Sequence, residues 1–347
     1  MTGWSRRRRW WVTGAALVGL VAGAGGLVTA VALRPDSPED VVREYLEVLE
    51  AGDAEAAREY AEAMPEFDAA SDELLVAEAM SRDWRITQVV RRHNERDNPA
   101  AVDVTITAAD GTAGQGRFQL DRGEDGWTIR NPLIKLDLLL LPLKFAEFNG
   151  VTAEASEVWL FPGAYQAYTS VSDLFTFSPS TFVAVPQDIS GGSLVEYYQP
   201  RIGFADGFDS VLHEQITAWI EDCAASTDPF PDGCPFTAGN PEYREIRVGR
   251  DRYLPLADTT VTWEVVSQPA VRLKQGQGAF EVLLVRPGEM RISGTAAEPL
   301  DHEPEDFRGT CTVLMDGVLV TMPRAGELAF HVGETTGWYA CSGHIDW

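Results

Sequence analysis

The sequence predicts an α+β fold: an N-terminal transmembrane helix, a domain of helices on an antiparallel sheet, a small β module and a second α+β domain. Three observations predict this class. Residues 12–33 carry no charge, apolar residues recur at helical spacing after residue 37, and apolar and polar residues alternate after residue 84. The change of period from helix to strand occurs again after residue 207, so the same element order is expected twice.

These patterns divide the 347 residues into five segments. We expect a basic cytoplasmic N-terminus at 1–11, a transmembrane helix at 12–33, a helix-and-sheet domain at 36–131, a β-rich module at 132–206 and a disulfide-containing α+β domain at 207–347.

The uncharged segment 12–33 is long enough to cross about 30 Å of hydrocarbon as a helix. Four arginines, 6–9, precede it, and Trp10 and Trp11 stand at its boundary. Basic residues favour the cytoplasmic side, and tryptophans favour the membrane interface. We therefore expect a single-pass protein of the cell membrane, with its N-terminus in the cytoplasm and its C-terminus outside the cell.

A cleaved signal peptide is the alternative for the same segment. Ala30 and Ala32 form an end of the A-x-A type that signal peptidases favour. The apolar run exceeds the usual length of about 7–15 residues in such peptides, which favours an anchor.

The charge of the chain lies almost entirely after the apolar segment. Five of the 28 basic residues and none of the 53 acidic ones lie in the first 34 residues. The remainder therefore carries 23 basic and 53 acidic side chains, a formal excess of 30 negative charges. Such a body repels phosphate backbones, so we expect no nucleic-acid partner.

The first helix is expected to begin after Ser37, an N-cap residue that is followed by Pro38 and two acids. Its apolar stripe ends at Gly52, and Asp53 can cap a second helix. A third short helix is expected at 71–80. Strands follow, separated by turn signals. The strands are expected around 102–107, 117–120 and 127–129, with turns at 110–111 and 124–126.

This order, together with the run from Ser37 to Ala57 and the closing Gly126-Trp127-Thr128-Ile129, resembles the nuclear transport factor 2-like fold. The version it resembles stands just outside the membrane in many bacterial envelope proteins. The resemblance covers about 36–131 and implies a cone-shaped domain, in which helices cover a curved antiparallel sheet. Some members are isomerases or dehydratases with acids and a histidine in the cone, and many only bind or assemble.

Segment 132–206 is rich in β-forming residues and turn signals, which predicts a small β module. Residues 138–143 are apolar but interrupted by Pro142, so we expect a buried or edge strand there rather than a membrane span. Phe161-Pro162-Gly163-Ala164-Tyr165, in this position, is similar to segments of envelope proteins with repeated extracytoplasmic domains, including some that respond to glycopeptide antibiotics.

The last domain is expected to begin with a helix from Phe208 to Cys223 and to continue in strands. The strands are predicted at 259–266, 280–285, 290–293, 310–322 and 328–332. Asp316-Gly317 is a hairpin signal. The element order repeats, but with little residue identity. The last domain is therefore either a divergent second copy of the first domain or not a repeat of it, and the sequence leaves both open.

Four cysteines lie in this last domain, and an even number in a translocated chain predicts disulfides. Four cysteines allow three pairings, and four free thiols are the alternative. We favour Cys223 with Cys234, which would close a short loop, and Cys311 with Cys341.

Few residues suggest chemistry. His93 and Asp103 are the types that an acid–base site in the first domain would use. Asp103 alternates with apolar residues and should face solvent, while His93 lies in a charged run, so we expect no catalytic residue. The acidic stretch 301–306 lacks the spacing of a calcium loop, and the histidines show no paired ligand spacing, so neither a metal site nor a cofactor is expected.

Aromatic residues offer the remaining candidate for binding. Tyr197, Tyr198, Phe204 and Phe208 form the densest local group, at the junction between modules. Most such residues fill cores, but an exposed patch here would be a ligand surface.

Two functions remain open from the sequence. The first is a non-enzymatic envelope protein that binds a cell-wall component or another envelope protein. The second is a small-molecule sensor or an isomerase-like enzyme that uses a cone-shaped pocket. A closed apolar filling between the helices and the sheets would favour the first function, and a deep polar pocket there would favour the second.

Overall fold

The computed structural model describes most of the chain after residue 36. The described residues are 37–61, 70–92, 98–124, 126–186, 195–239, 242–248, 252–256, 259–296, 305–333 and 341. The predicted cytoplasmic N-terminus and transmembrane helix, 1–11 and 12–33, therefore lie outside the described residues. Within the described residues, no helix combines the length and the apolar character needed to cross a membrane.

The α+β class is wrong, because the described residues form mostly strands in antiparallel sheets, with few helices. The predicted helix at 71–80 is one source of the error. Only η2 (Ala77–Ala79), a single 3₁₀ turn, forms there. Apolar spacing over so few residues is weak evidence for a helix, since a short helix gains little from its own hydrogen bonds.

Segment 37–131, called the first domain below, begins with two helices whose ends match the sequence signals. In α1 (Pro38–Ala51), the Ser37 side chain accepts a hydrogen bond from the Asp40 N–H, and Gly52 ends the helix in a left-handed conformation with φ 75°. Asp53 caps α2 (Ala54–Glu59) in the same way through the Ala56 N–H. Both caps were predicted.

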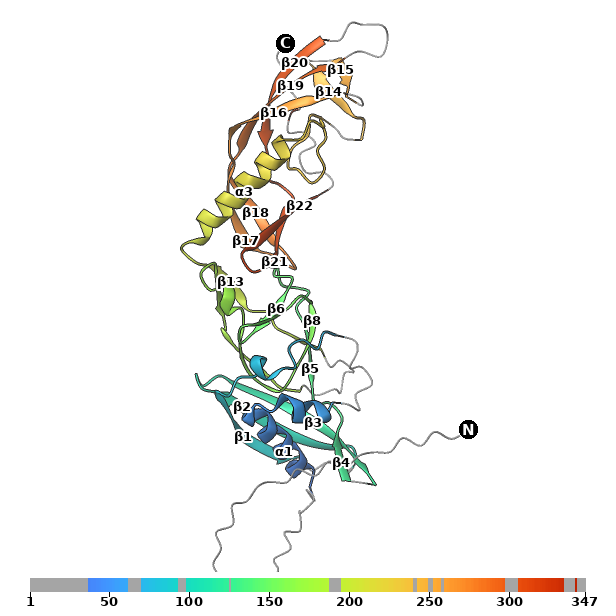
Figure 1. The fold of residues 1–347 in the computed structure, drawn as a ribbon, viewed down its shortest axis with the longest axis vertical. Coiled ribbons are helices and arrows are strands. Elements are labelled where there is room, and N and C mark those ends of the chain that lie inside the picture. Colours follow the sequence, from blue (N-terminus) through green and yellow to red (C-terminus); the bar gives the residue numbers. More distant parts are fainter. Residues whose placement is uncertain are drawn as a thin grey trace, which may run out of the picture. The chain divides into compact units, whose positions relative to one another are not determined.

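Four strands follow as one antiparallel sheet in chain order (Figure 1). They are β1 (Trp84–Arg91), β2 (Ala100–Ala108), β3 (Ala113–Gly123) and β4 (Gly126–Ile129). Val102, Val104 and Ile106 of β2 are buried on the face that α1 covers, as alternation predicts. The intervening residues face the other way.

The next segment, 132–206, called the β module below, consists of short strands. The strands are β5 (Ile134–Asp137), β6 (Ala146–Phe148), β7 (Val151–Ala153), β8 (Glu157–Leu160), β9 (Gly163–Gln166), β10 (Phe175–Ser178), β11 (Thr181–Ala184), β12 (Val195–Tyr197) and β13 (Arg201–Phe204), with the 3₁₀ turn η3 (Thr169–Val171) between β9 and β10. They form the small sheets β12-β5-β8, β6-β7, β9-β11 and β10-β13. The strand predicted at 138–143 is not formed: Leu138 and Leu141 are buried in turns, and Leu143 makes a single bridge to Met322.

Two glycines of β3 let the β module approach the first sheet. A Cβ on Gly114 would lie 2.6 Å from a methyl group of Val183, and one on Gly116 would lie 2.4 Å from the carbonyl oxygen of Pro186. The Arg117 N–H donates a 2.6 Å hydrogen bond to that same oxygen. The backbone after β11 therefore lies directly against β3, where no side chain larger than hydrogen fits.

The last domain places one long helix against a bent sheet. Its elements are α3 (Phe208–Ala224), β14 (Glu245–Val248), β15 (Arg252–Pro255), β16 (Val261–Ser267), β17 (Ala270–Gln275), β18 (Phe280–Arg286), β19 (Gly288–Ala296), β20 (Glu305–Val313), β21 (Val318–Arg324) and β22 (Glu327–Val332). The sheets β16-β19-β20 and β17-β18-β21-β22 continue one another, because only Gln268-Pro269 separates β16 from β17 and only Pro287 separates β18 from β19. Helix α3 packs against β16 and β17 (Figure 1).

The hairpin predicted at Asp316-Gly317 is not formed. Strands β20 and β21 flank this turn, yet β20 pairs with β19, and β21 pairs with β18 and β22. The turn instead carries the chain from one half of the bent sheet to the other. The turn residues were recognised correctly, but a turn does not specify which strands pair.

Both favoured disulfides are present. Cys223 at the end of α3 is bonded to Cys234, with Cα atoms 5.8 Å apart, and Cys311 of β20 is bonded to Cys341, with Cα atoms 4.2 Å apart. The second bond joins residues separated by 30 positions. It therefore holds Cys341 against β20 of the bent sheet.

Candidate functional site

The face of the first sheet that meets α1 is filled by apolar side chains. Tyr45 of α1 is completely buried, lies edge-on to Phe118 with ring centroids 5.9 Å apart, and donates a 2.5 Å hydrogen bond to the carbonyl of Pro132. Burial raises the pKa of Tyr45 well above its ordinary value, and the neighbouring Tyr165 and Tyr60 add to the rise. The place where a cone-shaped pocket was expected is therefore occupied by packed side chains.

The corresponding face of the last domain is filled in the same manner. The buried residues of α3 are Phe208, Leu212, Ile216, Ile220 and Cys223. They belong to one core cluster with Phe280 of β18 and with Met290 and Ile292 of β19. Ligands that need a deep pocket have no space at these positions.

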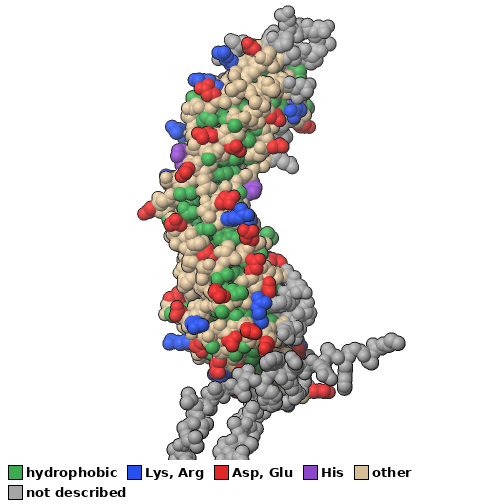
Figure 2. All heavy atoms as spheres, viewed as in Figure 1, with side chains coloured by type: hydrophobic (Ala, Val, Ile, Leu, Met, Phe, Trp, Pro, Cys, Tyr) green, Lys and Arg blue, Asp and Glu red, His purple; other side chains and the backbone are tan. Residues whose placement is uncertain are grey.

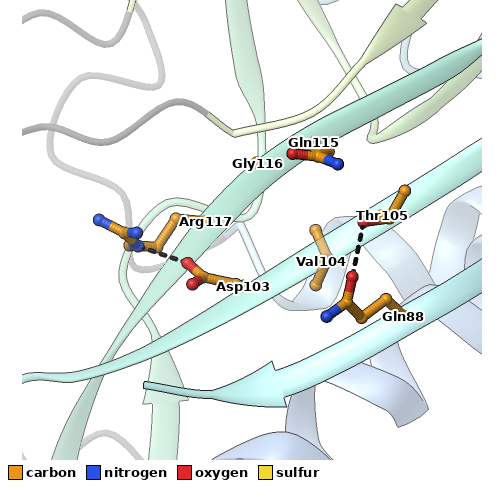
Figure 3. Close-up of a pocket in the computed structure, with 7 residues that line it drawn as sticks. All are labelled: Gln88, Asp103, Val104, Thr105, Gln115, Gly116 and Arg117. Atoms are coloured by element: carbon orange, nitrogen blue, oxygen red, sulfur yellow. Dashed lines mark hydrogen bonds and ion pairs between the residues drawn. The ribbon is translucent and has the colours of Figure 1, made fainter. Parts of the chain in front are cut away.

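A hollow of about 320 Å³ lies on the opposite face of the first sheet (Figure 3). The strand register arranges the side chains of this face in two rows that cross β1, β2 and β3, and all of them except Val90 line the hollow. One row is Gln88, Thr105 and Gln115, and the other is Val90, Asp103 and Arg117. Thr105 donates to the side-chain oxygen of Gln88 at 3.3 Å, within the first row.

The charged residues of this hollow are paired with each other. Arg117 Nε donates to Asp103 Oδ1 at 2.6 Å, and Arg92 Nε lies 3.8 Å from the other carboxylate oxygen. The Arg117 side chain is only 16% exposed. Because the guanidinium already neutralises the carboxylate, the hollow presents mainly amide and hydroxyl groups to a ligand.

These groups suit hydrogen bonding better than proton transfer. Gln88, Thr105 and Gln115 can both donate and accept, so they match ligands that carry hydroxyl or amide groups, such as sugars and peptides. Of the two acid–base candidates that the sequence offered, His93 lies outside the described residues. Asp103 faces away from α1, as predicted.

Two of the aromatic candidates, Tyr198 and Phe208, lie in the core. Tyr198 and Phe208 are 4% and 2% exposed, and the Tyr198 hydroxyl donates to the carbonyl of Pro179. Phe204 packs on Phe208 with ring centroids 4.6 Å apart. Tyr197 lies in β12, and its side chain is outside the described set. The structure therefore offers no exposed patch at Tyr198 or Phe208, and a ligand role for this group stays a prediction.

The other titratable candidates are dispersed. His331 of β22 is hydrogen-bonded to Thr321, and His213 is exposed on α3. Of the acidic stretch 301–306, only Glu305 and Asp306 belong to a described strand, and Asp306 accepts a hydrogen bond from Thr295. In the part of the chain that the structure describes, no group of three His, Cys, Asp or Glu residues is placed to hold a metal ion.

Sequence reasoning missed Gln88, Thr105, Gln115 and Arg117. Alternation does show that Asp103 and Thr105 share one face of β2. It does not show which residues of β1 and β3 stand beside them. The bulge in β1, where the register shifts between Ile86 and Gln88, is what places Gln88 opposite Thr105.

No family model, no curated protein and no solved structure matches the chain.

Proposed function

We propose that this chain is a non-enzymatic, membrane-anchored protein of the bacterial cell envelope, which binds a cell-wall component or a partner protein through the outer face of its first sheet. One observation carries the proposal. The face of the sheet that α1 covers is filled by packed side chains, whereas the hollow with hydrogen-bonding groups lies on the other face, which no described helix covers.

Two further features support an extracytoplasmic role. Both pairs of cysteines form disulfides, which persist in oxidising compartments. Acidic side chains are spread over the visible face of the molecule (Figure 2). Such a surface favours solubility outside the cell and disfavours binding to nucleic acids.

The ligand-binding part is tested with the full chain in nonionic detergent and isolated cell-wall material, by co-sedimentation. Thr105→Trp should fill the hollow and lower the bound fraction at least about tenfold, since a large ring would displace the ligand from the hydrogen-bonding groups. Thr128→Trp on β4, an exposed strand position outside the hollow, is the matched control. Equal binding by both variants would overturn the proposal for this face.

The anchoring part is tested separately in cells. A C-terminal fusion to a phosphatase that folds only outside the cytoplasm should be active. The mass of the purified protein should include residues 1–34. An inactive fusion would contradict the orientation, and a mass that lacks these residues would replace the anchored protein with a secreted one.

A further inference from the structure

A second polar hollow, of about 550 Å³, lies on the outer face of the bent sheet in the last domain. The strand register again arranges its side chains in two rows, which cross β16, β19 and β20. One row is Thr262, Ser293 and Arg308, and the other is Glu264, Arg291 and Thr310.

Alternation explains why these six side chains share one face. Trp263 and Ile292 lie between the polar residues of β16 and β19, and Phe307 precedes Arg308 on β20; all three are buried in the core cluster that contains α3. Successive side chains of a strand point to opposite faces of a sheet. The polar residues must therefore point away from the helix, and the disulfide-bonded Cys311 holds β20 from the buried side.

The charges in this hollow are not balanced as they are in the first one. Arg291 is paired with Glu264 at 3.3 Å, but both side chains are about 60% exposed, with values of 59% and 63%, so the pair contributes little. Arg308 forms no ion pair with any described residue. In the first hollow, by contrast, Arg117 is largely buried against Asp103.

The two arginines stand close enough to act on one ligand. Arg308 lies opposite Ser293, and Arg291 lies opposite Thr310, so they are diagonal neighbours on adjacent strands. The Cα atoms of such neighbours are about 7–8 Å apart. The two guanidinium groups carry like charges and repel each other, and Glu264 lies opposite Arg291 rather than Arg308. An anion between the arginines would remove the repulsion.

We infer that this hollow binds an oxyanion group, a phosphate or a carboxylate, between Arg291 and Arg308, with the hydroxyls of Thr262, Ser293 and Thr310 as additional donors. Guanidinium groups bind these oxyanions through paired hydrogen bonds. The surrounding body carries an excess of negative charge, which repels anions elsewhere on the surface. The site is separate from the hollow in the first domain and does not depend on the function proposed above.

The experiment uses the full chain in nonionic detergent, with inorganic pyrophosphate and citrate as probes, and measures the dissociation constants by calorimetry at low salt. Arg308→Gln should weaken binding of the preferred probe at least about tenfold, the equivalent of roughly 1.4 kcal/mol. Thr310→Glu should abolish binding by adding a negative charge at the centre of the hollow. Arg272→Gln, which removes an exposed arginine of β17 outside the hollow, is the matched control.

Tighter binding of pyrophosphate would identify the natural group as a phosphate, and tighter binding of citrate would identify it as a carboxylate. Both outcomes support the site, provided that Arg272→Gln binds like the parent protein. Absence of binding by the parent protein, or equal weakening by Arg308→Gln and Arg272→Gln, would overturn it. Circular dichroism of Arg308→Gln and Thr310→Glu, two exposed strand positions, checks that both variants are folded.

Discussion

The hydroxyl of Thr181 on β11 donates a 2.6 Å hydrogen bond to the carboxylate of Asp110, in the turn between β2 and β3. Gln166 of β9 donates to the same hydroxyl at 2.9 Å. A turn of the first domain is thereby joined to a two-stranded sheet of the β module. The bond lowers the pKa of Asp110, and the Thr112 N–H, which also donates to this carboxylate, contributes to the decrease.

This bond predicts a pH dependence of stability. Because the native pKa of Asp110 lies below the unfolded value of about 3.9, the bond stabilises the fold above that pH and is lost as the pH falls through the native pKa. Asp110→Asn and Thr181→Val should each lower the melting temperature at pH 7, and the difference from the parent should shrink below about pH 4. Asp173→Asn, at an exposed position, is the control and should show no such trend. A difference that stays constant with pH would contradict the role of the bond.

Gly116 should not tolerate a side chain. Gly116→Ala places a methyl group against the Pro186 carbonyl, so the free energy of unfolding should fall by about 1–3 kcal/mol, measured by urea denaturation. Gly123→Ala, in the same strand, is the control, because its Cβ would meet only ordinary contacts at 3.8 Å. If both variants are equally stable, the backbone after β11 does not lie against β3.

Glu147 is a buried acid with a structural role. Its carboxylate accepts hydrogen bonds from the Thr169 hydroxyl and from the N–H and hydroxyl of Ser170, all at the start of η3. Glu147→Ala leaves these donors unpaired and should cost about 2 kcal/mol or more in the free energy of unfolding.

The control for this variant is Glu154→Ala. Glu154 pairs with Arg324, but its side chain is 71% exposed, so its loss should cost less than about 1 kcal/mol. The two variants are compared by chemical denaturation. Similar losses for both would show that the Glu147 hydrogen bonds contribute no more than a surface ion pair.

The two disulfides should differ in the stability they confer. The chain-entropy model gives about 3.6 kcal/mol for the bond between Cys311 and Cys341, and about 2.8 kcal/mol for the bond between Cys223 and Cys234, since their separations are 30 and 11 residues. Replacing each pair by alanines should therefore lower the melting temperature more for the longer loop. Peptide mapping without reduction checks the pairing, and a reversed order of stability would exclude loop length as the main cause.

Local signals were reliable where the structure depends on neighbours in sequence. The helix caps at Ser37 and Asp53 and the alternation in β2 were predicted and are present. The fold class was wrong in part because the apolar residues at helical spacing in 71–80 form only one 3₁₀ turn, whereas strands make up most of the described residues. Strand pairing was wrong at Asp316-Gly317, where a correct turn signal suggested a hairpin.

The sequence by itself determined the ends of the first two helices and the inward and outward faces of the long strands. Each depends on residues within a few positions, or on a periodicity that one strand carries alone. The tertiary structure decided which strands are neighbours, why Gly116 has no side chain, and why Arg117 is paired whereas Arg308 is not. These depend on register, which many weak contacts between distant segments set together, so no short stretch of sequence contains it.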